Sequence, residues 1–403
     1  MFTGKRILLG VTGGIAAYKS ALLVRELVRA GAEVQVIMTR AATQFITPLT
    51  MSTLSRREVV VEMFPASPED PALQSTKHIE LALWGDVMLI APASANTIAK
   101  IAHGTADNFL TTLVLALRCP LAVAPAMDMD MYLNETTQRN VASLREVGCH
   151  IIDPEIGELA SGLSGPGRLP EVDRLLDGVG KILAGAHRDL AGKNVLVTAG
   201  PTHEPIDPVR YVGNRSSGKM GFAMATAAAH RGANVTLIAG PVALRTPRSV
   251  RRIDVQTARE MAGAVEREFP SSQLLVMAAA VADFAPAHVA EQKIKRSGTG
   301  GLTLELTPNP DILRSVAKRK KGQIVVGFAL ETEHGEEHAR AKLKDKQLDL
   351  IVLNNPREEG AAFGADTNIV TLISPDGEPE RLPQMAKIDV AHAILSRAAV
   401  LLK

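Results

Sequence analysis

Short, nearly continuous apolar runs recur along this 403-residue chain, and segments long enough for helices separate them. The clearest runs lie within residues 4–15, 28–40, 86–96, 192–203, 230–241 and 273–283. Uninterrupted apolar runs are typical of strands buried on both faces of a parallel sheet, with crossover helices between them. The pattern therefore predicts the α/β fold class, with helices covering both faces of doubly wound sheets.

The two halves of the chain follow one plan. Residues 4–15 and 192–203 share a Gly-Lys pair, an apolar run, a threonine and a glycine turn. The later runs, 86–96 and 273–283, both end in small residues, as expected where the carboxyl ends of strands meet a ligand. We expect one architecture used twice, although alternating strand-helix units also resemble one another by chance.

Length points to two domains, because one hydrophobic core stops growing at about 250 to 300 residues. The boundary is expected within residues 185–194, which gives a domain over 1–190 and another over 191–403. Residues 155–171 are rich in Gly, Ser and Pro and have little capacity for regular structure. We interpret that segment as a candidate lid.

Composition and charge favour small-molecule chemistry. The chain is 46% hydrophobic and 3% aromatic, and its net charge is only +2, so it has no global field for nucleic acid or an anionic membrane. The two cysteines, Cys119 and Cys149, form no CxxC pair and suggest no metal site. With no signal-like or membrane-spanning apolar stretch, the expected localisation is cytoplasmic.

The glycine turn in GVTGGIAAYK (residues 10–19) fits a phosphate, because it leads from a strand into a helix N-terminus. It is not GxGxxG, and the next strand lacks the acidic residue that an NAD ribose requires. The hydroxyls of Thr12 and Thr39 suit a phosphate monoester, and Ser94 and Asn96 follow the third strand. FMN fits this half better than NAD, with ordinary helix caps and a tight turn as the alternative.

Two motifs of the second half are near matches only. Residues 213–220 almost spell the P-loop GxxxxGK[ST], but Met220 cannot offer a hydroxyl to magnesium. We interpret them as an anion-binding helix start that Ser216 or Ser217 can cap. The HxxEH pattern of His334 and His338 contains a glycine and has no evident third ligand, so we do not expect a zinc site.

Four motifs in order give the first half a family resemblance. They are GVTGGIAAYK, HIEL, APASANTIAKI and PAMDMDMY, at residues 10–19, 78–81, 91–101 and 125–132. Together they resemble the flavin-dependent cysteine decarboxylases, and the second half resembles the matching ligase. Over nearly its whole length the chain is similar to the fused phosphopantothenoylcysteine decarboxylases and phosphopantothenate-cysteine ligases of bacterial coenzyme A synthesis. The resemblance implies a flavodoxin-like domain followed by a Rossmann-like ligase domain.

For the first domain, the resemblance implies that FMN accepts hydride as the substrate thiol is oxidised, which releases carbon dioxide, and then returns the hydride. His78 matches the active-site histidine, although a lone histidine before a helix is more often a cap or surface residue. Asp128 replaces an asparagine that helps to hold the substrate carboxylate, and Ser161 replaces a cysteine that donates a proton. The FMN-binding positions it implies are Thr12, Gly13, Gly14, Ile15, Thr39, Ser94 and Asn96.

For the second domain, the resemblance implies an acyl-cytidylate made from CTP and attacked by the cysteine amine, with release of CMP. Asn214 and Arg210 match residues that hold this intermediate, and Lys293 matches a lysine that stabilises the transferring phosphate. The matching nucleotide-binding positions are Met277, Ala278, Ala279, Asp283, Lys293, Pro310, Asp311, Ile312, Leu313, Phe328, Lys342 and Lys346. Magnesium should accompany the triphosphate, with ligands that the sequence does not identify.

Alternatives remain open at this stage. Without the resemblance, Lys342 and Lys346 are simply one solvated helix face. Because Asp128 and Ser161 depart from the family pattern, a flavin-binding regulatory protein is a rival for the first half. Another aminoacyl thiol or another nucleotide is a second rival. The resemblance also implies a homo-oligomer in which dimeric ligase units join trimeric decarboxylase units.

Overall fold

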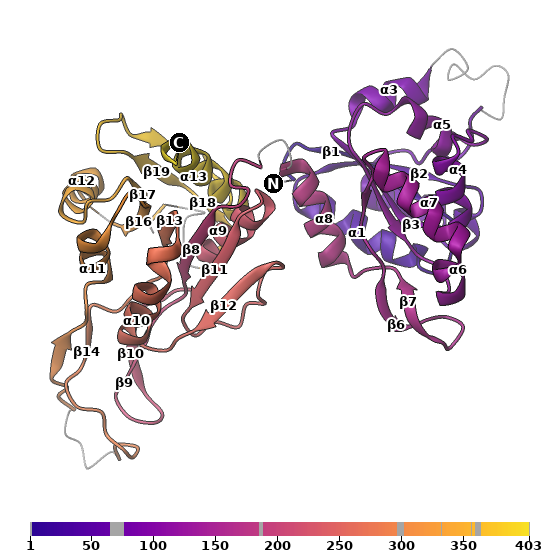
Figure 1. Cartoon of the computed structure of the whole chain (residues 1–403). Helices are drawn as coiled ribbons and strands as arrows, with labels where there is room; N and C mark the ends of the chain where they lie inside the picture. The colour runs from indigo at the N-terminus through magenta and orange to yellow at the C-terminus, as the bar shows by residue number, and fades with distance from the viewer. Residues whose placement is uncertain are drawn as a thin grey trace. The chain divides into compact units, whose positions relative to one another are not determined.

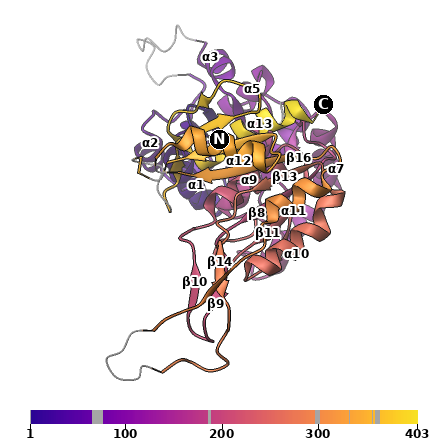
Figure 2. The same ribbon diagram turned by 90° about the vertical axis from the view of Figure 1, so that its left-hand side faces the viewer.

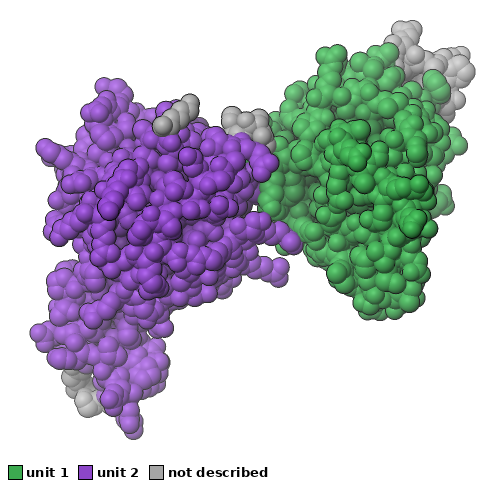
Figure 3. Space-filling view, viewed as in Figure 1, with its two compact units in different colours: residues 1–186 green, residues 187–403 purple. Residues whose placement is uncertain are grey.

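The computed structural model describes residues 2–64, 76–184, 188–295, 302–331, 333–355, 357–358 and 364–402. The chain divides into two compact units, residues 1–186 (unit 1) and 187–403 (unit 2) (Figure 3). Within the described ranges, no helix is long and apolar enough to cross a membrane.

Unit 1 is built on a parallel sheet with the strand order β2-β1-β3-β4-β5 (Figure 1). The strands of the unit are β1 (Arg6–Val11), β2 (Glu33–Met38), β3 (Val87–Ala93), β4 (Leu121–Pro125), β5 (His150–Ile151), β6 (Glu155–Glu158) and β7 (Ser164–Arg168). Its helices are α1 (Ala17–Arg29), α2 (Pro48–Ser55), α3 (Lys77–Trp84), α4 (Ala95–Ala102), α5 (Phe109–Ala116), α6 (Met129–Leu133), α7 (Glu135–Glu146) and α8 (Val172–Ala184).

Both faces of this sheet are covered. Along β1, Ile7 and Leu9 pack into a core with α1, α2 and α8, whereas Leu8 packs into the opposite core with α3, α4, α5 and α7. Successive side chains of a strand point to opposite faces, so an uninterrupted apolar run is what a two-sided core requires. The strand order is that of flavodoxin-like doubly wound sheets.

Unit 2 contains an eight-stranded sheet of order β12-β11-β8-β13-β16-β17-β19-β20, in which β19 pairs antiparallel with both β17 and β20. The strands of the unit are β8 (Asn194–Ala199), β9 (His203–Pro205), β10 (Tyr211–Gly213), β11 (Asn234–Ala239), β12 (Val250–Asp254), β13 (Leu274–Met277), β14 (Phe284–Pro286), β15 (Leu306–Pro308), β16 (Ile324–Leu330), β17 (Leu350–Asn354), β18 (Thr367–Asn368), β19 (Val370–Ile373), β20 (Glu380–Arg381) and β21 (Met385–Ala386). Its α-helices are α9 (Lys219–His230), α10 (Ala258–Glu268), α11 (Ile312–Arg319), α12 (Gly335–Asp345) and α13 (Lys387–Leu401).

The same two-sided packing holds in unit 2. Val195 and Val197 of β8 belong to the core with α9 and α13, and Leu196 belongs to the core with α10, α11 and α12. The first six strands of the sheet, taken in their order of packing, follow the classic Rossmann order. The predicted fold class, two doubly wound α/β domains, is confirmed.

One prediction of local structure was wrong. The Gly, Ser and Pro-rich segment 155–171 was expected to lack regular structure, but it forms the antiparallel hairpin β6–β7. Two glycines explain why the composition misleads. A Cβ on Gly165 would lie 2.2 Å from Sδ of Met129, and one on Gly167 would lie 2.3 Å from the carbonyl oxygen of Met127. The hairpin needs these glycines to approach the chain after β4 closely.

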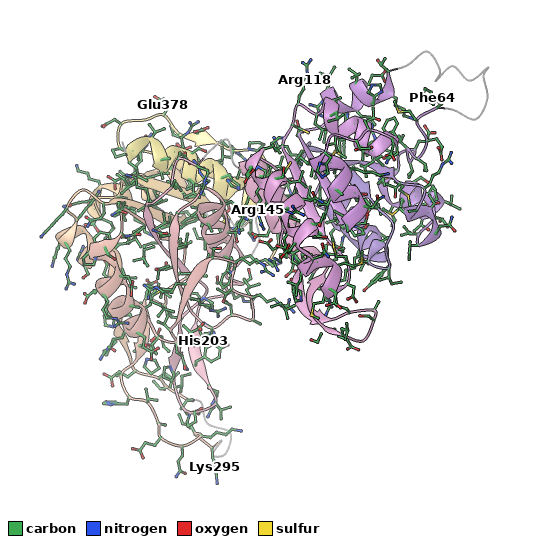
Figure 4. All side chains as sticks on the ribbon, turned by 45° about the vertical axis from the view of Figure 1, so that its right-hand side comes forward. Phe64, Arg118, Arg145, His203, Lys295 and Glu378 are labelled. Carbon is green, nitrogen blue, oxygen red and sulfur yellow. The ribbon has the colours of Figure 1, made fainter. Side chains whose placement is uncertain are left out.

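A second feature has no counterpart in the predictions. Strands β9 and β10 form a hairpin, and β14 pairs with β15, in two small sheets that extend away from the main sheet of unit 2 (Figure 2). We call residues 203–213 together with 284–295 the arm. Figure 4 labels His203 and Lys295, which both lie on it.

Candidate active sites

The predicted FMN positions gather where β1, β2 and β3 end. These strands are neighbours, so Thr39 after β2 and Ser94 after β3 flank the turn that follows β1. Ser94 caps α4 by accepting a hydrogen bond from the Thr97 N–H at 3.3 Å. Asn96 is exposed in the first turn of the same helix. The three polar side chains therefore lie at one edge of the sheet.

Thr12 has a different place from the one expected. It is fully buried, its hydroxyl donates to the Pro92 carbonyl at 2.8 Å, and it accepts from the Ser94 N–H at 2.9 Å. The hydroxyl thus joins the end of β1 to the end of β3 behind the glycine turn. In front of it, a Cβ on Gly13 would lie 2.6 Å from Cβ of Ala41, whereas Gly14 and Ile15 face open space.

The two residues that depart from the family pattern are in direct contact. The Ser161 hydroxyl, at the tip of the β6–β7 hairpin, donates a hydrogen bond to Oδ2 of Asp128. Asp128 is the N-cap of α6, where its Oδ1 accepts from the Asp130 N–H at 3.4 Å. The Met127 N–H donates to the Gly167 carbonyl at 3.0 Å, which fixes the hairpin beside this pair.

Sequence reasoning missed Lys19, which ties the base of the hairpin to α1. Its side chain is 7% exposed, and its ammonium donates to the Leu169 carbonyl at 3.1 Å and to Glu171 at 2.9 Å. The hydrogen bond from Lys19, opposed by desolvation, lowers the pKa of Glu171, and Arg168 adds a further ion pair. A lysine on the amphipathic α1 looks solvated in the sequence, so only the tertiary fold reveals this role.

His78 is not brought to the Asp128–Ser161 pair. It is half-buried in the first turn of α3, and Figure 1 shows α3 and the β6–β7 hairpin at opposite ends of unit 1. Within the part of the chain that the structure describes, no hydrogen bond joins His78 to Asp128 or Ser161.

In unit 2, the predicted nucleotide positions do come together. They line a cavity of about 440 Å³ at the carboxyl ends of β13 and β16. Those that line it are Met277, Ala279, Asp283, Pro310, Asp311, Ile312, Leu313, Phe328, Lys342 and Lys346. Ala278 instead faces an adjoining cavity of about 600 Å³, together with Asn214 and the first turn of α9. The two cavities share Ala279, Val281, Asp283, Phe328 and Lys342 as a common wall.

Lys342 and Lys346 are held in place rather than spread on a solvated helix face. Lys342 donates to the Phe328 carbonyl at 2.9 Å, and burial lowers its pKa. Lys346 donates to Oδ2 of Asp311 at 2.6 Å and forms an ion pair with Asp345, and these bonds raise its pKa. Asn214 donates to the Val281 carbonyl at 2.9 Å at the edge of the larger cavity.

Arg210 and Lys293 lie apart from these cavities. Both belong to the arm, and neither lines the two cavities described above. Arg210 is paired with Asp207, and Lys293 is exposed. His334 is the N-cap of α12, and His338 lies in the first turn of that helix. Nδ1 of His338 lies 3.2 Å from Oε2 of Glu331. In the described ranges, no group of three or more His, Cys, Asp or Glu side chains is placed to hold a metal ion.

Two family models divide the chain between them. The model described as "Flavoprotein" matches residues 1–184, and the model described as "DNA/pantothenate metabolism flavoprotein C-terminal domain" matches residues 190–401. Together with the two α/β folds, these matches define the class: a flavoprotein domain followed by a pantothenate-metabolism domain.

The chain belongs to the family of coenzyme A biosynthesis bifunctional proteins, CoaBC. The member from Bacillus subtilis (strain 168) is 46% identical over 405 residues, which cover 100% of this chain and 98% of that protein. The chain is accordingly a bifunctional decarboxylase and phosphopantothenate-cysteine ligase. It joins cysteine to phosphopantothenate and decarboxylates the product to phosphopantetheine.

Two other proteins are similar to this chain. The crystal structure of the C-terminal domain of a CoaBC protein is 39% identical and covers 53% of this chain and 98% of its own, with a TM-score of 0.47. A protein from an unknown prokaryotic organism, named cysteine/cysteine sulfinic acid decarboxylase, is 46% identical over 361 residues, or 88% of this chain and 99% of that protein.

Proposed function

We propose that residues 1–190 carry the decarboxylase and bind FMN at the carboxyl edge of the sheet. The supporting observation is the group of Thr39, Ser94 and Asn96 around the close turn at Gly13. Helix α1 begins without a side-chain cap, which leaves backbone N–H groups for a phosphate. Gly14 and Ile15 lie in the segment just before the helix. Thr12 orders the turn from behind. FMN held by these residues would supply the hydride acceptor for the oxidation that precedes decarboxylation and the hydride donor for the final reduction.

In this site, Ser161 orients a water molecule or the enethiolate, and Asp128 holds Ser161. A serine hydroxyl is a far weaker acid than a cysteine thiol, whose ordinary pKa is about 8.5, so the serine does not supply its own proton. The Ser161–Asp128 hydrogen bond supports this assignment because it fixes the position of the hydroxyl at the tip of the hairpin. His78 is the residue that we assign to proton transfer, a role that an imidazole commonly has in general acid-base catalysis.

Residues 191–403 carry the ligase, which we assign to CTP with Mg²⁺. The smaller cavity takes the nucleotide, and Lys342 and Lys346 supply positive charge beside its phosphates. The larger cavity, which begins at Asn214 and the uncapped start of α9, takes phosphopantothenate. The single observation that carries this proposal is the shared wall of the two cavities. It allows the substrate carboxylate to meet the α-phosphate of CTP and form the acyl-cytidylate.

The active enzyme is proposed to be a homo-oligomer, with trimeric decarboxylase and dimeric ligase units. Helix α3, which carries His78, and the β6–β7 hairpin, which carries Ser161, lie at opposite ends of unit 1 (Figure 1), so a second copy is needed to bring both residues to one substrate. Large apolar side chains on α1 and just before it are exposed, namely Ile15, Tyr18 and Leu22. In unit 2, Arg210 and Lys293 project on an arm outside the cavities of their own copy.

A direct test of cofactor and nucleotide uses the purified full chain. Acid extraction should release FMN, and phosphopantothenate with Mg²⁺ should yield pyrophosphate from CTP but not from ATP, before cysteine is added. Free cysteine is the rival decarboxylase substrate to be tested, because one relative is named for that activity. ATP supporting the reaction as well as CTP, or rapid carbon dioxide release from free cysteine alone, would contradict these assignments.

A further inference from the structure

The arm contains a buried carboxylate that neither cavity uses. Asp207 lies in the turn between β9 and β10 and is 2% exposed. Its Oδ1 accepts from the N–H groups of Val209 at 2.8 Å and Arg210 at 2.9 Å. Burial opposes its ionisation, but hydrogen bonds from these N–H groups, the Arg210 guanidinium and the Ile294 N–H hold its pKa well below its usual value. Asp207 is therefore a fixed negative charge inside the turn.

The same carboxylate reaches the segment that carries Lys293. Oδ2 of Asp207 accepts from Nε and Nη2 of Arg210 at 3.0 and 2.7 Å, and from the Ile294 N–H at 3.1 Å. Arg210 Nη2 also donates to the Ile294 carbonyl at 2.6 Å. Asp207 and Arg210 thus satisfy both backbone groups of Ile294, the residue after Lys293. The Ala290 N–H donates to the Ile206 carbonyl at 3.0 Å and fastens the other end of the segment.

The β9–β10 hairpin is itself fixed to the body of unit 2. Glu204 is buried, and its Oε1 accepts from the Ala258 N–H, at the start of α10, at 2.9 Å. The His203 N–H donates to the Gln256 carbonyl at 2.8 Å. The rings of His203 and Tyr211 stack across the hairpin with centroids 3.7 Å apart. A chain of fixed contacts therefore runs from α10 through the hairpin to Ile294.

We propose that Asp207 and Arg210 form a clamp that positions Lys293 for the ligase reaction. This inference rests on the proposed role of Lys293 with the transferring phosphate. Arg210 acts through the clamp instead of contacting the acyl intermediate, and Asp207 is a positioning residue that sequence analysis did not find. The Arg210 guanidinium already donates hydrogen bonds to Asp207 and to the Ile294 carbonyl. A buried carboxylate destabilises a protein unless it is paired and hydrogen-bonded, and Arg210 meets that need of Asp207.

The test combines each clamp variant with Lys293→Ala in the full chain. Asp207→Asn removes the charge at nearly constant shape, and Arg210→Lys keeps the charge but loses the fork. Because small displacements of a catalytic group are costly, each should lower the ligase kcat by about tenfold or more with little change in the KM for CTP. In the Lys293→Ala background the same substitutions should have almost no further effect. Asp254→Asn, which weakens the ion pair of the exposed Asp254 side chain with Arg252 on β12, is the matched control and should behave as wild type.

A second readout does not depend on catalysis. Trypsin should cut after Lys293 and Lys295 faster in Asp207→Asn than in wild type, at an unchanged thermal midpoint. If Lys293→Ala lowers the ligase kcat and Arg210→Lys lowers it as much again in that background, Arg210 contacts the intermediate and the clamp proposal is wrong. If Lys293→Ala retains the full rate, the role proposed for Lys293 fails instead. An unchanged trypsin pattern in Asp207→Asn would overturn the clamp by itself.

Discussion

Single residues explain why part of each site was predictable and part was not. Lys342 and Lys346 could be assigned from the family resemblance, and they do line one cavity with Asp311. Lys19 and Asp207 could not be assigned, because a charged residue is visible in the sequence but its burial and partners are not. Thr12 was predicted to bind a phosphate, but its hydroxyl donates a hydrogen bond to the Pro92 carbonyl near the end of β3. No local sequence pattern indicates that contact.

The first residue-level prediction concerns Ser161. Ser161→Ala should slow the formation of phosphopantetheine, because the hydroxyl that Asp128 holds is lost, while the ligase rate is unchanged. Ser161→Cys should instead speed the final reduction, since a thiol is a much stronger acid. The measurement is product analysis by mass spectrometry during a single turnover. Full turnover by Ser161→Ala would remove this residue from the mechanism.

The second concerns the pH dependence of the ligase. Burial lowers the pKa of Lys342 below its usual value of 10.5, so as the pH rises its positive charge is lost at a lower pH than that of a solvated lysine. We expect kcat/KM for CTP, which reports the free enzyme, to fall on the alkaline side before pH 10.5. Lys342→Arg should move that limb upward, because arginine does not deprotonate there. An unmoved limb would assign it to another group.

At the level of elements, periodicity predicted the buried strands well and the small hairpins poorly. Apolar runs such as that of β3 are long and uninterrupted, so contacts elsewhere in the fold do not change the strand that they predict. Hairpin β6–β7 has few strand-forming residues and depends on contacts between Gly165 and Met129 that are distant in sequence. The β9–β10 hairpin is likewise held by a buried carboxylate in its turn, which local propensity does not register.

The β6–β7 hairpin supplies a prediction at this scale. Gly165→Ala places a methyl group on the Met129 side chain, so the hairpin or that side chain must shift, and overpacking of this kind costs about 1–3 kcal/mol. Decarboxylation should slow while CTP consumption stays normal. Gly157→Ala is the matched control on the facing strand, because its added Cβ would meet only the Arg168 side chain at 3.4 Å. Equal decarboxylation rates in the two variants would show that the hairpin position does not matter.

At the scale of the whole molecule, two compact units of similar architecture carry successive reactions, and assembly decides which residues meet. Lys293 lies on the arm, whereas Asp283 lies in the cavity wall. A variant of each residue can therefore be combined in one mixed dimer. Lys293→Ala and Asp283→Asn are each expected to be poor ligases. Refolding or co-expressing them together should restore CMP release, because a mixed dimer joins an intact cavity to an intact arm. Absence of any restoration would mean that each copy uses its own lysine.

One chain performs both reactions, and it does so with Asp128 and Ser161 in its decarboxylase domain. The most direct measurement incubates the purified full chain with phosphopantothenate, cysteine, CTP and Mg²⁺ and follows all products by mass spectrometry. We expect CMP, carbon dioxide and phosphopantetheine in equal amounts. CMP without carbon dioxide, or carbon dioxide with an enethiol in place of phosphopantetheine, would contradict it.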